Sequence, residues 1–357
     1  REDAQEDAVL GILSPKQKPV KIWKPSPRPP EAKLRKICVA RQLGGVGDFL
    51  MCTPVFRGLK ERWGPDCHIT LATDSHYMAG ALPLLAKHNP FIDDVVRVDP
   101  FEFVCSPTRA VRLEFRNTPN ERVPRCVVDT DLVIDLNVIC ALTETATQPH
   151  VTEHRTDIWC RAAGVTPSSK RPILVLTADE LAEGRQWCDQ HLGVGTRVGV
   201  VLAAKDPARG WPFAQQFAWE LHQLGYRTVT IDAQIGRVHP RVPAMIGMHI
   251  RRVAAAVAHL DAVVTPDTGI LHVAGTLGVP VLGLFGPTDG ALRMREYPGS
   301  YTNPKALVDC APCWYLHPCT KERNVDRHYI CMRRLTPEFV LDELERMLNR
   351  FGKELPY

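Results

Sequence analysis

Residues 261–289 contain two short apolar runs on either side of a segment with helical periodicity. The runs, 262–264 and 279–285, are apolar at consecutive positions, which is typical of parallel strands buried on both faces. Between them, the polar turn 266–269 can begin a helix and Gly278 can end it. Such a strand–helix–strand unit leaves backbone N–H groups unpaired at the carboxyl edge of the sheet, where an anion such as pyrophosphate can bind. A well-capped helix without a ligand would have the same pattern.

Short apolar runs alternate with amphipathic segments along most of the chain. This alternation predicts a mostly parallel sheet with helices on both faces. Besides the unit above, we expect strands at 36–41, 68–72, 94–98, 132–136, 198–202 and 228–231. We expect helices at 49–63, 76–85, 151–163, 178–192, 213–224, 251–259 and 337–351.

Gly, Pro, Ser and Lys cluster without periodicity at 164–172, which predicts a hinge. A chain of 357 residues is long enough for two domains, so we expect an α/β protein with two Rossmann-like, doubly wound domains facing a cleft. Residues 101–124 have mixed charge and no clear period, and we expect a surface loop there. The predicted organisation is a proline-rich arm at 1–34, an N-terminal domain at 35–168, a C-terminal domain at 169–308, a four-cysteine module at 309–332, and a final helix and tail at 333–357.

The charge of the chain bears on its partners. The formal net charge is +4 and the positive residues are spread out, so nucleic-acid binding is not expected, whereas an anionic substrate is compatible. No apolar run approaches the roughly 20 residues that a membrane-spanning helix needs. Eight of the twelve cysteines lie singly in expected core elements and predict buried thiols in a reducing cytosol: Cys38, Cys52, Cys67, Cys105, Cys126, Cys140, Cys160 and Cys188.

A glycine-rich turn at 44–48 follows the first expected strand and opens the first helix. It lacks the full G-x-G-x-x-G spacing, so a dinucleotide-binding dehydrogenase is weakly supported. The turn places Asp48 in the first helical turn at the cleft, where a carboxylate can take a proton from a hydroxyl nucleophile. A carboxylate here can also serve only to complement the helix dipole.

The loop after the first strand of the second expected domain carries two cations, Lys205 and Arg209. Cations at the cleft edge suit a diphosphate leaving group, because they oppose the negative charge that builds up as the bond breaks. Solvated loop charges are the alternative. Trp211 and Pro212, which follow, are more typical of packing and of a helix start.

Three stretches, GGVGDFLMCTP, ARGWPF and TPDTGILHVAGTLGVPVLGLFGPTD, resemble in order and spacing the motifs of glycosyltransferase family 9, the heptosyltransferase type. The resemblance covers about residues 36–350, and DTGILH and FGPTD are its most specific parts. It implies a GT-B fold with an N-terminal acceptor domain and a C-terminal nucleotide-sugar domain. It also implies inverting transfer of a sugar, typically heptose from ADP-heptose, to lipopolysaccharide core or a protein, with no metal required for transfer.

The resemblance implies roles for individual residues. Asp48 matches the general base that deprotonates the acceptor hydroxyl. Thr268 and Gly269 match the residues that hold the donor phosphates, and Asp267 matches an acidic position near the donor sugar. Arg209 stands where many members have a phosphate-binding lysine, although a guanidinium differs from an ammonium in its geometry.

His272 lies one helical turn beyond Asp267 and on the same face, where it is either a donor contact or a packing residue. Asp232 follows the strand 228–231, where members often place a glutamate for the nucleotide ribose, so the chain departs from the family there. The expected donor-binding residues are Lys205, Arg209, Asp232, Asp267, Thr268, Gly269, His272, Gly286 and Thr288.

Cys310, Cys313, Cys319 and Cys331 form the pattern C-x₂-C-x₅-C-x₁₁-C, which is typical of a tetrahedral thiolate site. Zinc is the default metal, iron is the rival, and His317 can replace one ligand. Two disulfides or free thiols are the alternatives. Some members of the resembled family, including autotransporter heptosyltransferases with an iron site, carry C-terminal cysteines. We expect a structural metal that stabilises this loop-rich segment and takes no part in transfer.

The expected partners are therefore a nucleotide-sugar donor and a glycan or protein acceptor. The expected location is the cytoplasm, and a peripheral position at the inner membrane is left open. The rival hypothesis is a non-catalytic sugar-nucleotide-binding or assembly protein on the same scaffold. Neither the oligomeric state nor the role of residues 1–34 follows from the sequence.

Overall fold

The structure is a computed structural model that describes residues 34–42, 44–73, 81–97, 130–232, 238–302, 308–316, 319, 324–325 and 328–353. Residues Leu34–Tyr357 form one compact unit. The expected arm, apart from Leu34, and the expected loop at 101–124 lie outside the described residues, as do Cys105, Cys126 and His317.

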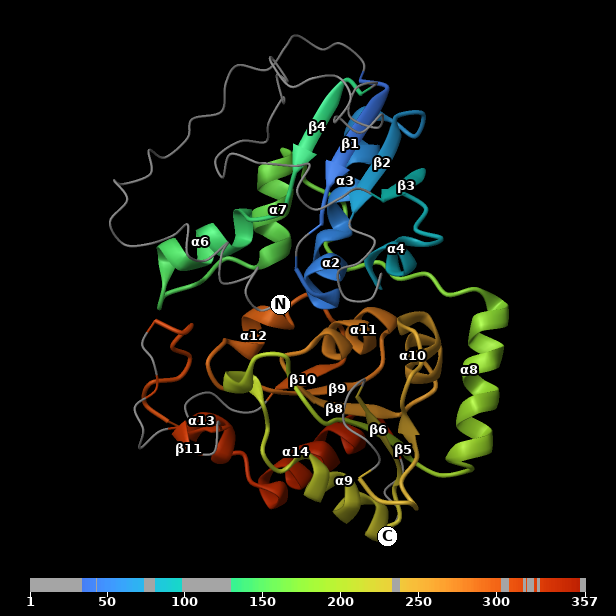
Figure 1. The fold of residues 1–357 in the computed structure, drawn as a ribbon, viewed down its shortest axis with the longest axis vertical. Helices are drawn as coiled ribbons and strands as arrows, with labels where there is room; N and C mark the ends of the chain where they lie inside the picture. The colour runs from blue at the N-terminus through green and yellow to red at the C-terminus, as the bar shows by residue number, and fades with distance from the viewer. Residues whose placement is uncertain are drawn as a thin grey trace. The chain divides into compact units, whose positions relative to one another are not determined.

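The N-terminal half is built on a four-stranded parallel sheet of order β3-β2-β1-β4 (Figure 1). Ala40 lies opposite both Ala72 and Asp135, so the central strands end together at one edge. The strands are β1 (Lys36–Ala40), β2 (His68–Thr73), β3 (Asp94–Arg97) and β4 (Leu132–Asp135). The helices are α2 (Val46–Cys52), α3 (Pro54–Trp63), α4 (Ala81–Ala86), α6 (Ile139–Thr147) and α7 (Arg155–Ala163).

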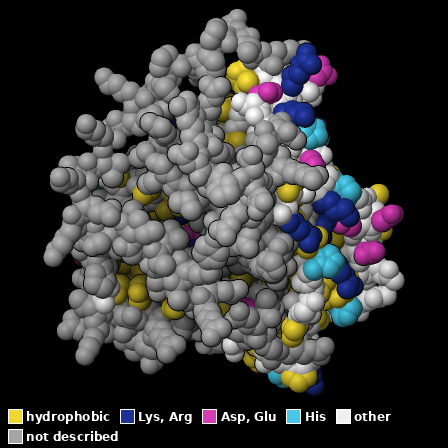
Figure 2. All heavy atoms as spheres, turned by 45° about the horizontal axis from the view of Figure 1, so that its top comes forward, with side chains coloured by type: hydrophobic (Ala, Val, Ile, Leu, Met, Phe, Trp, Pro, Cys, Tyr) yellow, Lys and Arg dark blue, Asp and Glu magenta, His cyan; other side chains and the backbone are white. Residues whose placement is uncertain are grey.

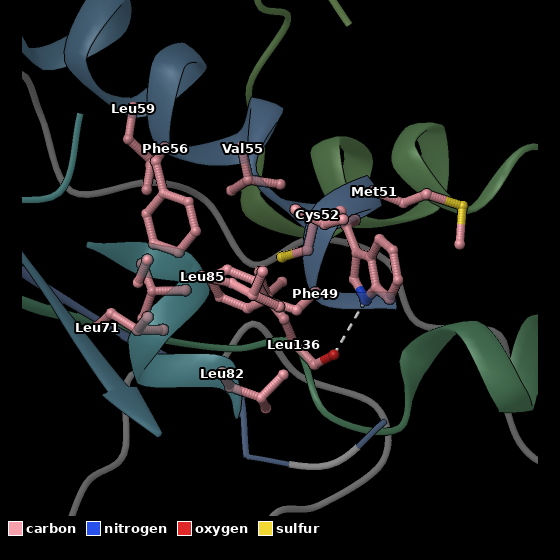
Figure 3. Close-up of a cluster of buried hydrophobic side chains, with 14 of the residues drawn as sticks. Phe49, Met51, Cys52, Val55, Phe56, Leu59, Leu71, Leu82, Leu85 and Leu136 are labelled. Carbon is pink, nitrogen blue, oxygen red and sulfur yellow. Dashed lines mark hydrogen bonds between the residues drawn. The ribbon is translucent and has the colours of Figure 1, made fainter. Parts of the chain in front are cut away.

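The hydrophobic core of this half forms where α2, α3 and α4 cover the sheet. Figure 3 shows their apolar side chains converging with Leu71 of β2 and with Leu136, which follows β4. The dashed line in Figure 3 is the hydrogen bond of 3.0 Å that Trp159 Nε1 donates to the Leu136 carbonyl oxygen. Each large apolar side chain that is fully buried here contributes about 1.5–3 kcal/mol. This core holds α2, and therefore the turn before it, in a fixed position on the sheet.

The C-terminal half has a six-stranded parallel sheet of order β10-β9-β8-β5-β6-β7. The strands are β5 (Arg197–Val201), β6 (Arg227–Ile231), β7 (Ala244–Met245), β8 (Ala262–Pro266), β9 (Val281–Leu284) and β10 (Ser300–Thr302). The helices are α8 (Ala178–His191), α9 (Ala214–Gln223), α10 (Ile250–Val257), α11 (Gly269–Leu277), α12 (Gly290–Arg293), α13 (Ile330–Arg333) and α14 (Pro337–Arg350). A 3₁₀ turn, η2 (Pro207–Arg209), follows β5, and β11 (Asn324–Val325) pairs with β12 (His328–Tyr329).

Neighbouring residues of the central strands pack on opposite faces of this second sheet. Ala262 and Val264 of β8 pack with α9 and α14, whereas Val263 between them packs with α8, α10 and α11. Strand β9 repeats the pattern with Val281 on one face and Leu282 on the other. Because helices cover both faces, nearly every position of β8 and β9 is apolar, with Thr265 the exception, as the sequence pattern predicts for 262–264 and 279–285.

The predicted alternation of strand and helix is confirmed, with three differences. The helix expected at 49–63 is two helices, α2 and α3, because Pro54 has no N–H to continue the ladder and opens α3. The helix expected at 151–163 begins at Arg155, since His154 caps it. The sequence did not predict helix α6 or several short elements: α12, α13, β7, β10, β11 and β12. The short elements have too few residues to show a period.

The described surface carries charges of both signs. In the face shown in Figure 2, Lys and Arg side chains alternate with Asp, Glu and His over the described part. Among the described residues, no helix is long and apolar enough to cross a membrane.

Candidate functional site

Asp48 occupies the third position of α2, after the turn that follows β1. The Gly45 amide donates a hydrogen bond of 3.0 Å to Asp48 Oδ2, so the carboxylate caps its own helix. Arg155 Nη1, from α7, donates to the other oxygen, Oδ1. The capping role that the sequence pattern left open is therefore present, and it is combined with an ion pair.

Four charged side chains of alternating sign run from Asp48 to α12. Arg155 Nε and Nη2 donate to the two oxygens of Glu144 at 2.8 and 2.7 Å. Arg293 Nη1 donates to Glu144 Oε1 at 2.8 Å, and these two side chains are only 5% and 9% exposed. We call this series, Asp48–Arg155–Glu144–Arg293, the charge chain. Sequence reasoning missed it, because its members lie on four helices and periodicity does not tell which helices meet.

Burial and neighbouring charges act in opposite directions on the carboxyls of the charge chain. Burial raises the pKa of Asp48. Arg155, Arg41 and the Gly45 amide together lower it by more, so the pKa lies well below its usual range. Burial also raises the pKa of Glu144, but Arg155 and Arg293 lower it by more, to about 2. Both carboxylates are therefore ionised at neutral pH.

Helix α2 packs directly against α11. A Cβ built on Gly47 of α2 would lie 2.2 Å from Cδ2 of His272, and one built on Gly269 of α11 would lie 2.8 Å from Cβ of Val46. Glycine at both positions lets the first turns of the two helices meet, since any side chain would separate them. The start of α2, which carries Asp48, therefore lies beside the start of α11.

Asp267 follows β8, is buried, and gathers groups from three segments. Thr288 Oγ1 donates to its Oδ2 at 3.1 Å, and Arg209 Nη1 donates to its carbonyl oxygen at 3.0 Å and lies 3.8 Å from Oδ2. His272 Nε2 lies 3.9 Å from Oδ1, which is an ion-pair distance rather than a hydrogen bond. Burial raises the pKa of Asp267, but His272, Arg209 and Arg293 bring it well below its usual range. Four expected donor-binding residues are thus together: Arg209, Asp267, His272 and Thr288.

His272 is both a packed histidine and a neighbour of the candidate site. It is 3% exposed, and its Nδ1 lies 2.7 Å from the hydroxyl oxygen of Tyr297. Its ring also lies against Gly47, as described above. The ring is therefore fixed on one side by Tyr297 while Nε2 faces Asp267, so packing and an electrostatic role coexist.

Arg209 and the start of α11 have hydrogen-bond donors left for a ligand. Arg209 Nε is buried and has no hydrogen-bond partner among the described residues, although Asp206 Oδ2 lies 3.9 Å away. Thr268 is the N-cap of α11, but its hydroxyl pairs with Thr265 Oγ1 at 2.9 Å rather than capping the helix. The polar turn 266–269 thus begins α11 as expected, but the first amides of α11 receive no hydrogen bond from the Thr268 side chain.

The remaining expected donor residues lie near this edge without a resolved role. Lys205 is exposed in the loop after β5, and Asp232 directly follows β6. A Cβ on Gly286 would lie 2.6 Å from Cys331 Sγ, so this glycine allows α13 to pack closely beneath the turn. The assignment of these three residues to donor binding stays a prediction.

The four C-terminal cysteines are near one another but do not form a coordination sphere. Burial raises the pKa of Cys331 to about 12, and the nearby Cys319, Cys313 and Cys310 contribute to the shift. None of the four forms a disulfide bond, so the disulfide alternative is not realised. Within the described part of the chain, no three His, Cys, Asp or Glu side chains are arranged to hold a metal ion. The described cysteines expected in the core are buried: Cys38, Cys52, Cys67, Cys140, Cys160 and Cys188.

The sequence is similar to known proteins over part of its length. Residues 244–315 match the family model of glycosyltransferase family 9 (heptosyltransferase). Lipopolysaccharide heptosyltransferase 1 of Pseudomonas aeruginosa is 34% identical over 155 residues, which is 41% of this chain. The matched stretch spans 42% of the length of that relative.

Solved structures extend the similarity of fold over most of the chain. The glycosyl transferase family 9 protein from Veillonella parvula has a TM-score of 0.63 at 18% identity, covering 88% of this chain and 97% of that one. TibC from enterotoxigenic E. coli, an iron-containing dodecameric glycosyltransferase, has a TM-score of 0.60 at 17% identity, covering 89% and 77%. TibC has also been solved in complex with ADP-D-β-D-heptose.

The two parallel sheets with their covering helices are thus the expected GT-B fold. The family-model match includes β8, α11, β9 and the residues around Asp267. Together, the match over 244–315 and the shared fold make the chain similar to the heptosyltransferases of glycosyltransferase family 9.

Proposed function

We propose that this protein is an inverting glycosyltransferase that moves heptose from ADP-heptose to a hydroxyl group of lipopolysaccharide core or of a protein. The family-model match over 244–315 and the similarity to a lipopolysaccharide heptosyltransferase support this reaction class. The complex of TibC with ADP-D-β-D-heptose supports the choice of donor. The buried cysteines of the described chain, which form no disulfides, support a reducing, cytoplasmic location for the reaction.

One observation carries the proposal: the ionised Asp48 is held beside the start of α11, next to Arg209 and Asp267. The close packing of α2 on α11 brings the two halves together at this point. Arg209 is near enough for the charge of Asp48 to act on it. A transferase needs this juxtaposition, because the acceptor hydroxyl and the departing phosphate must reach the same carbon from opposite sides.

In the donor half, the diphosphate binds between Arg209 and the first amides of α11. Arg209 Nε has no acceptor among the described residues, and a guanidinium can donate to two phosphate oxygens at once. The amides at the start of α11 have no cap from Thr268, and the helix dipole adds positive potential there. Thr288 and His272 keep Asp267 in place beside this site.

In the transfer step, Asp48 takes the proton of the acceptor hydroxyl as the acceptor oxygen forms a bond to the anomeric carbon. The bond from that carbon to the phosphate oxygen breaks, and the nucleoside diphosphate leaves with the electron pair. Because the pKa of Asp48 is low, proton transfer accompanies bond formation rather than preceding it. Arg155 holds the carboxylate in orientation and keeps it ionised.

We also propose a structural metal, zinc or iron, at Cys310, Cys313, Cys319 and Cys331. The spacing of the cysteines and their mutual proximity support it, and so does the likeness in fold to the iron-containing TibC. No step of the transfer depends on this metal. Metal analysis of the purified protein tests it: less than about half an equivalent of zinc plus iron would contradict the proposal.

The reaction is tested with a panel of sugar nucleotides that includes ADP-heptose, ADP-glucose, UDP-glucose and GDP-mannose. We expect ADP-heptose to raise the melting temperature most, because a ligand that binds only the folded state stabilises it. Release of ADP on addition of a lipopolysaccharide-core acceptor then reports transfer. Failure of every sugar nucleotide to protect the protein would contradict the proposal.

The rival function, a non-catalytic sugar-nucleotide-binding or assembly protein, predicts a different outcome in the same experiment. Such a protein would be protected by the donor but would neither hydrolyse it nor transfer the sugar. The ionised Asp48 beside the donor edge favours catalysis, since a binding module has no need of a base at that position.

A further inference from the structure

Tyr297 lies behind His272, in the segment between α12 and β10. It is buried and packs in the cluster that α10 and α11 form on one face of the second sheet. A Cβ built on Gly275 of α11 would lie 2.6 Å from Cγ of Tyr297, so the phenol ring lies directly against the helix. The Tyr297 hydroxyl oxygen is 2.7 Å from Nδ1 of His272, and the two rings meet at 64°. Tyr297 therefore contacts the imidazole at the nitrogen that does not face Asp267.

The surroundings of His272 favour one tautomer of its ring. Nε2 lies 3.9 Å from Oδ1 of the ionised Asp267. A lone pair on Nε2 would face this negative oxygen and be repelled, whereas an N–H group there is attracted. A neutral imidazole with its proton on Nε2 has its lone pair on Nδ1, and the Tyr297 hydroxyl then donates to that lone pair. The two contacts of the ring thus support the same tautomer.

The His272 ring is also held by the first turn of α2. Its Cδ2 lies only 2.2 Å from the point that a Cβ on Gly47 would occupy, next to Asp48 in the sequence. A ring that turned away from Tyr297 would lose the buried hydrogen bond at Nδ1 and would have to keep clear of α2. Tyr297 on one side and Gly47 on another therefore fix the direction of the Nε2–H bond beside the candidate site.

We propose that Tyr297 is a positioning residue that acts through His272: its hydroxyl donates to Nδ1 and so keeps the imidazole proton on Nε2, where it can be donated to an oxygen of the sugar nucleotide. The inference rests on the proposed function, because it assumes a nucleotide-sugar at this edge. At 3.9 Å, Asp267 Oδ1 attracts the N–H group from beyond hydrogen-bond distance, so the proton stays available to a ligand. The opposite tautomer would present a lone pair to the oxygens of the donor and repel them.

The first measurement reads the tautomer of His272 in the free protein. Nitrogen-15 NMR of labelled histidine side chains distinguishes a protonated from an unprotonated ring nitrogen, and the spectrum of His272→Gln identifies the signals of His272. We expect the proton on Nε2 in the wild type. In Tyr297→Phe the signal of the unprotonated Nδ1 should shift, because that nitrogen loses its hydrogen bond. A proton on Nδ1 in the wild type, or an unchanged Nδ1 signal in Tyr297→Phe, would overturn the inference.

The second measurement is kcat/KM for ADP-heptose in a double-mutant cycle. We expect Tyr297→Phe to lower kcat/KM about tenfold, as for the loss of one hydrogen bond, and to cause no further loss when His272 is already Gln. Tyr226→Phe is the control, because it removes the hydroxyl of another buried tyrosine, which packs in the cluster with α9 and α14.

Tyr226→Phe should keep the kcat/KM of the wild type. A merely structural role of Tyr297 would lower kcat/KM equally with His272 and with Gln at position 272, and that result would overturn the inference. Activity of Tyr297→Phe within about twofold of the wild type would overturn it as well. A wild type that turned over no sugar nucleotide would instead contradict the proposed function and, with it, the donor contact of His272.

Discussion

At the scale of single residues, burial and neighbouring charges set the protonation of the site. His154 is fully buried and caps α7, where its Nδ1 accepts a hydrogen bond of 3.2 Å from the Thr156 amide. Its Nε2 lies 3.4 Å from the Arg293 carbonyl oxygen, which needs a proton on that nitrogen. Burial, together with Arg295 and Arg293, lowers the pKa of His154 to about 3, so the imidazole is neutral.

This neutral histidine predicts a loss of stability in mild acid. The pKa of His154 is about 3 in the folded protein and 6.5 unfolded, so between these pH values the unfolded chain binds more protons. The contribution of His154 is complete above about pH 6.5 and is lost as the pH falls toward 3. Urea unfolding at pH 7.5, 6 and 5 should show a smaller decline for His154→Gln than for the wild type.

The exposed His191 provides the control. The stability of His191→Gln should decline with pH as that of the wild type does, because this variant leaves the buried His154 in place. Equal pH dependence for the wild type and His154→Gln would show that His154 does not carry the effect.

At the scale of helices and strands, the sequence predicts what periodicity encodes and misses what packing decides. Strand β8 was expected because residues 262–264 are apolar at consecutive positions, and all of its residues are buried. The charge chain was not expected, because the pairing of Glu144 with Arg155 and Arg293 depends on three helices meeting. Asp48 and Asp267 were singled out by their place after strands.

The contact between α2 and α11 predicts that Gly47 does not tolerate a side chain. In Gly47→Ala the new methyl would meet the His272 ring at 2.2 Å, and Tyr297 prevents that ring from moving freely. We expect a loss of about 1–3 kcal/mol in the free energy of unfolding, as for other overpacked sites. Gly45→Ser is the control, because an added Cβ at Gly45 meets nothing within 4 Å and Ser is a preferred N-cap residue. Wild-type stability of Gly47→Ala would contradict the close contact.

At the scale of the whole molecule, buried charged groups tie the two halves of the compact unit together. Arg251 of α10 donates to the Leu84 carbonyl oxygen at the end of α4 at 2.9 Å and to the Val175 carbonyl oxygen before α8 at 2.8 Å. Glu144 joins Arg155 of the N-terminal half to Arg293 of the C-terminal half. Glu144, which joins the halves, also holds Arg155, the partner of Asp48. The stability of the protein and the geometry at Asp48 are therefore linked.

Removing the charge of Glu144 should destabilise the protein strongly. Glu144→Gln leaves Arg293 buried with a weaker partner, and breaking a buried ion pair in this way costs about 3–5 kcal/mol. Glu153→Gln is the matched control. The side chains of Glu153 and Arg161 are 35% and 61% exposed, so their ion pair should contribute less than about 1 kcal/mol. Chemical denaturation measures both variants. Equal losses would show that the charge chain is no more important than a surface pair.

The most direct test of the account is the turnover of Asp48→Asn with ADP-heptose and a hydroxyl acceptor. Asparagine keeps the oxygen that accepts from the Gly45 amide but cannot take a proton. We predict that kcat falls by roughly 10²–10⁴-fold while the Kd for ADP-heptose stays close to that of the wild type. Near-normal turnover by Asp48→Asn would contradict the assignment of Asp48 as the base and, with it, the proposed mechanism.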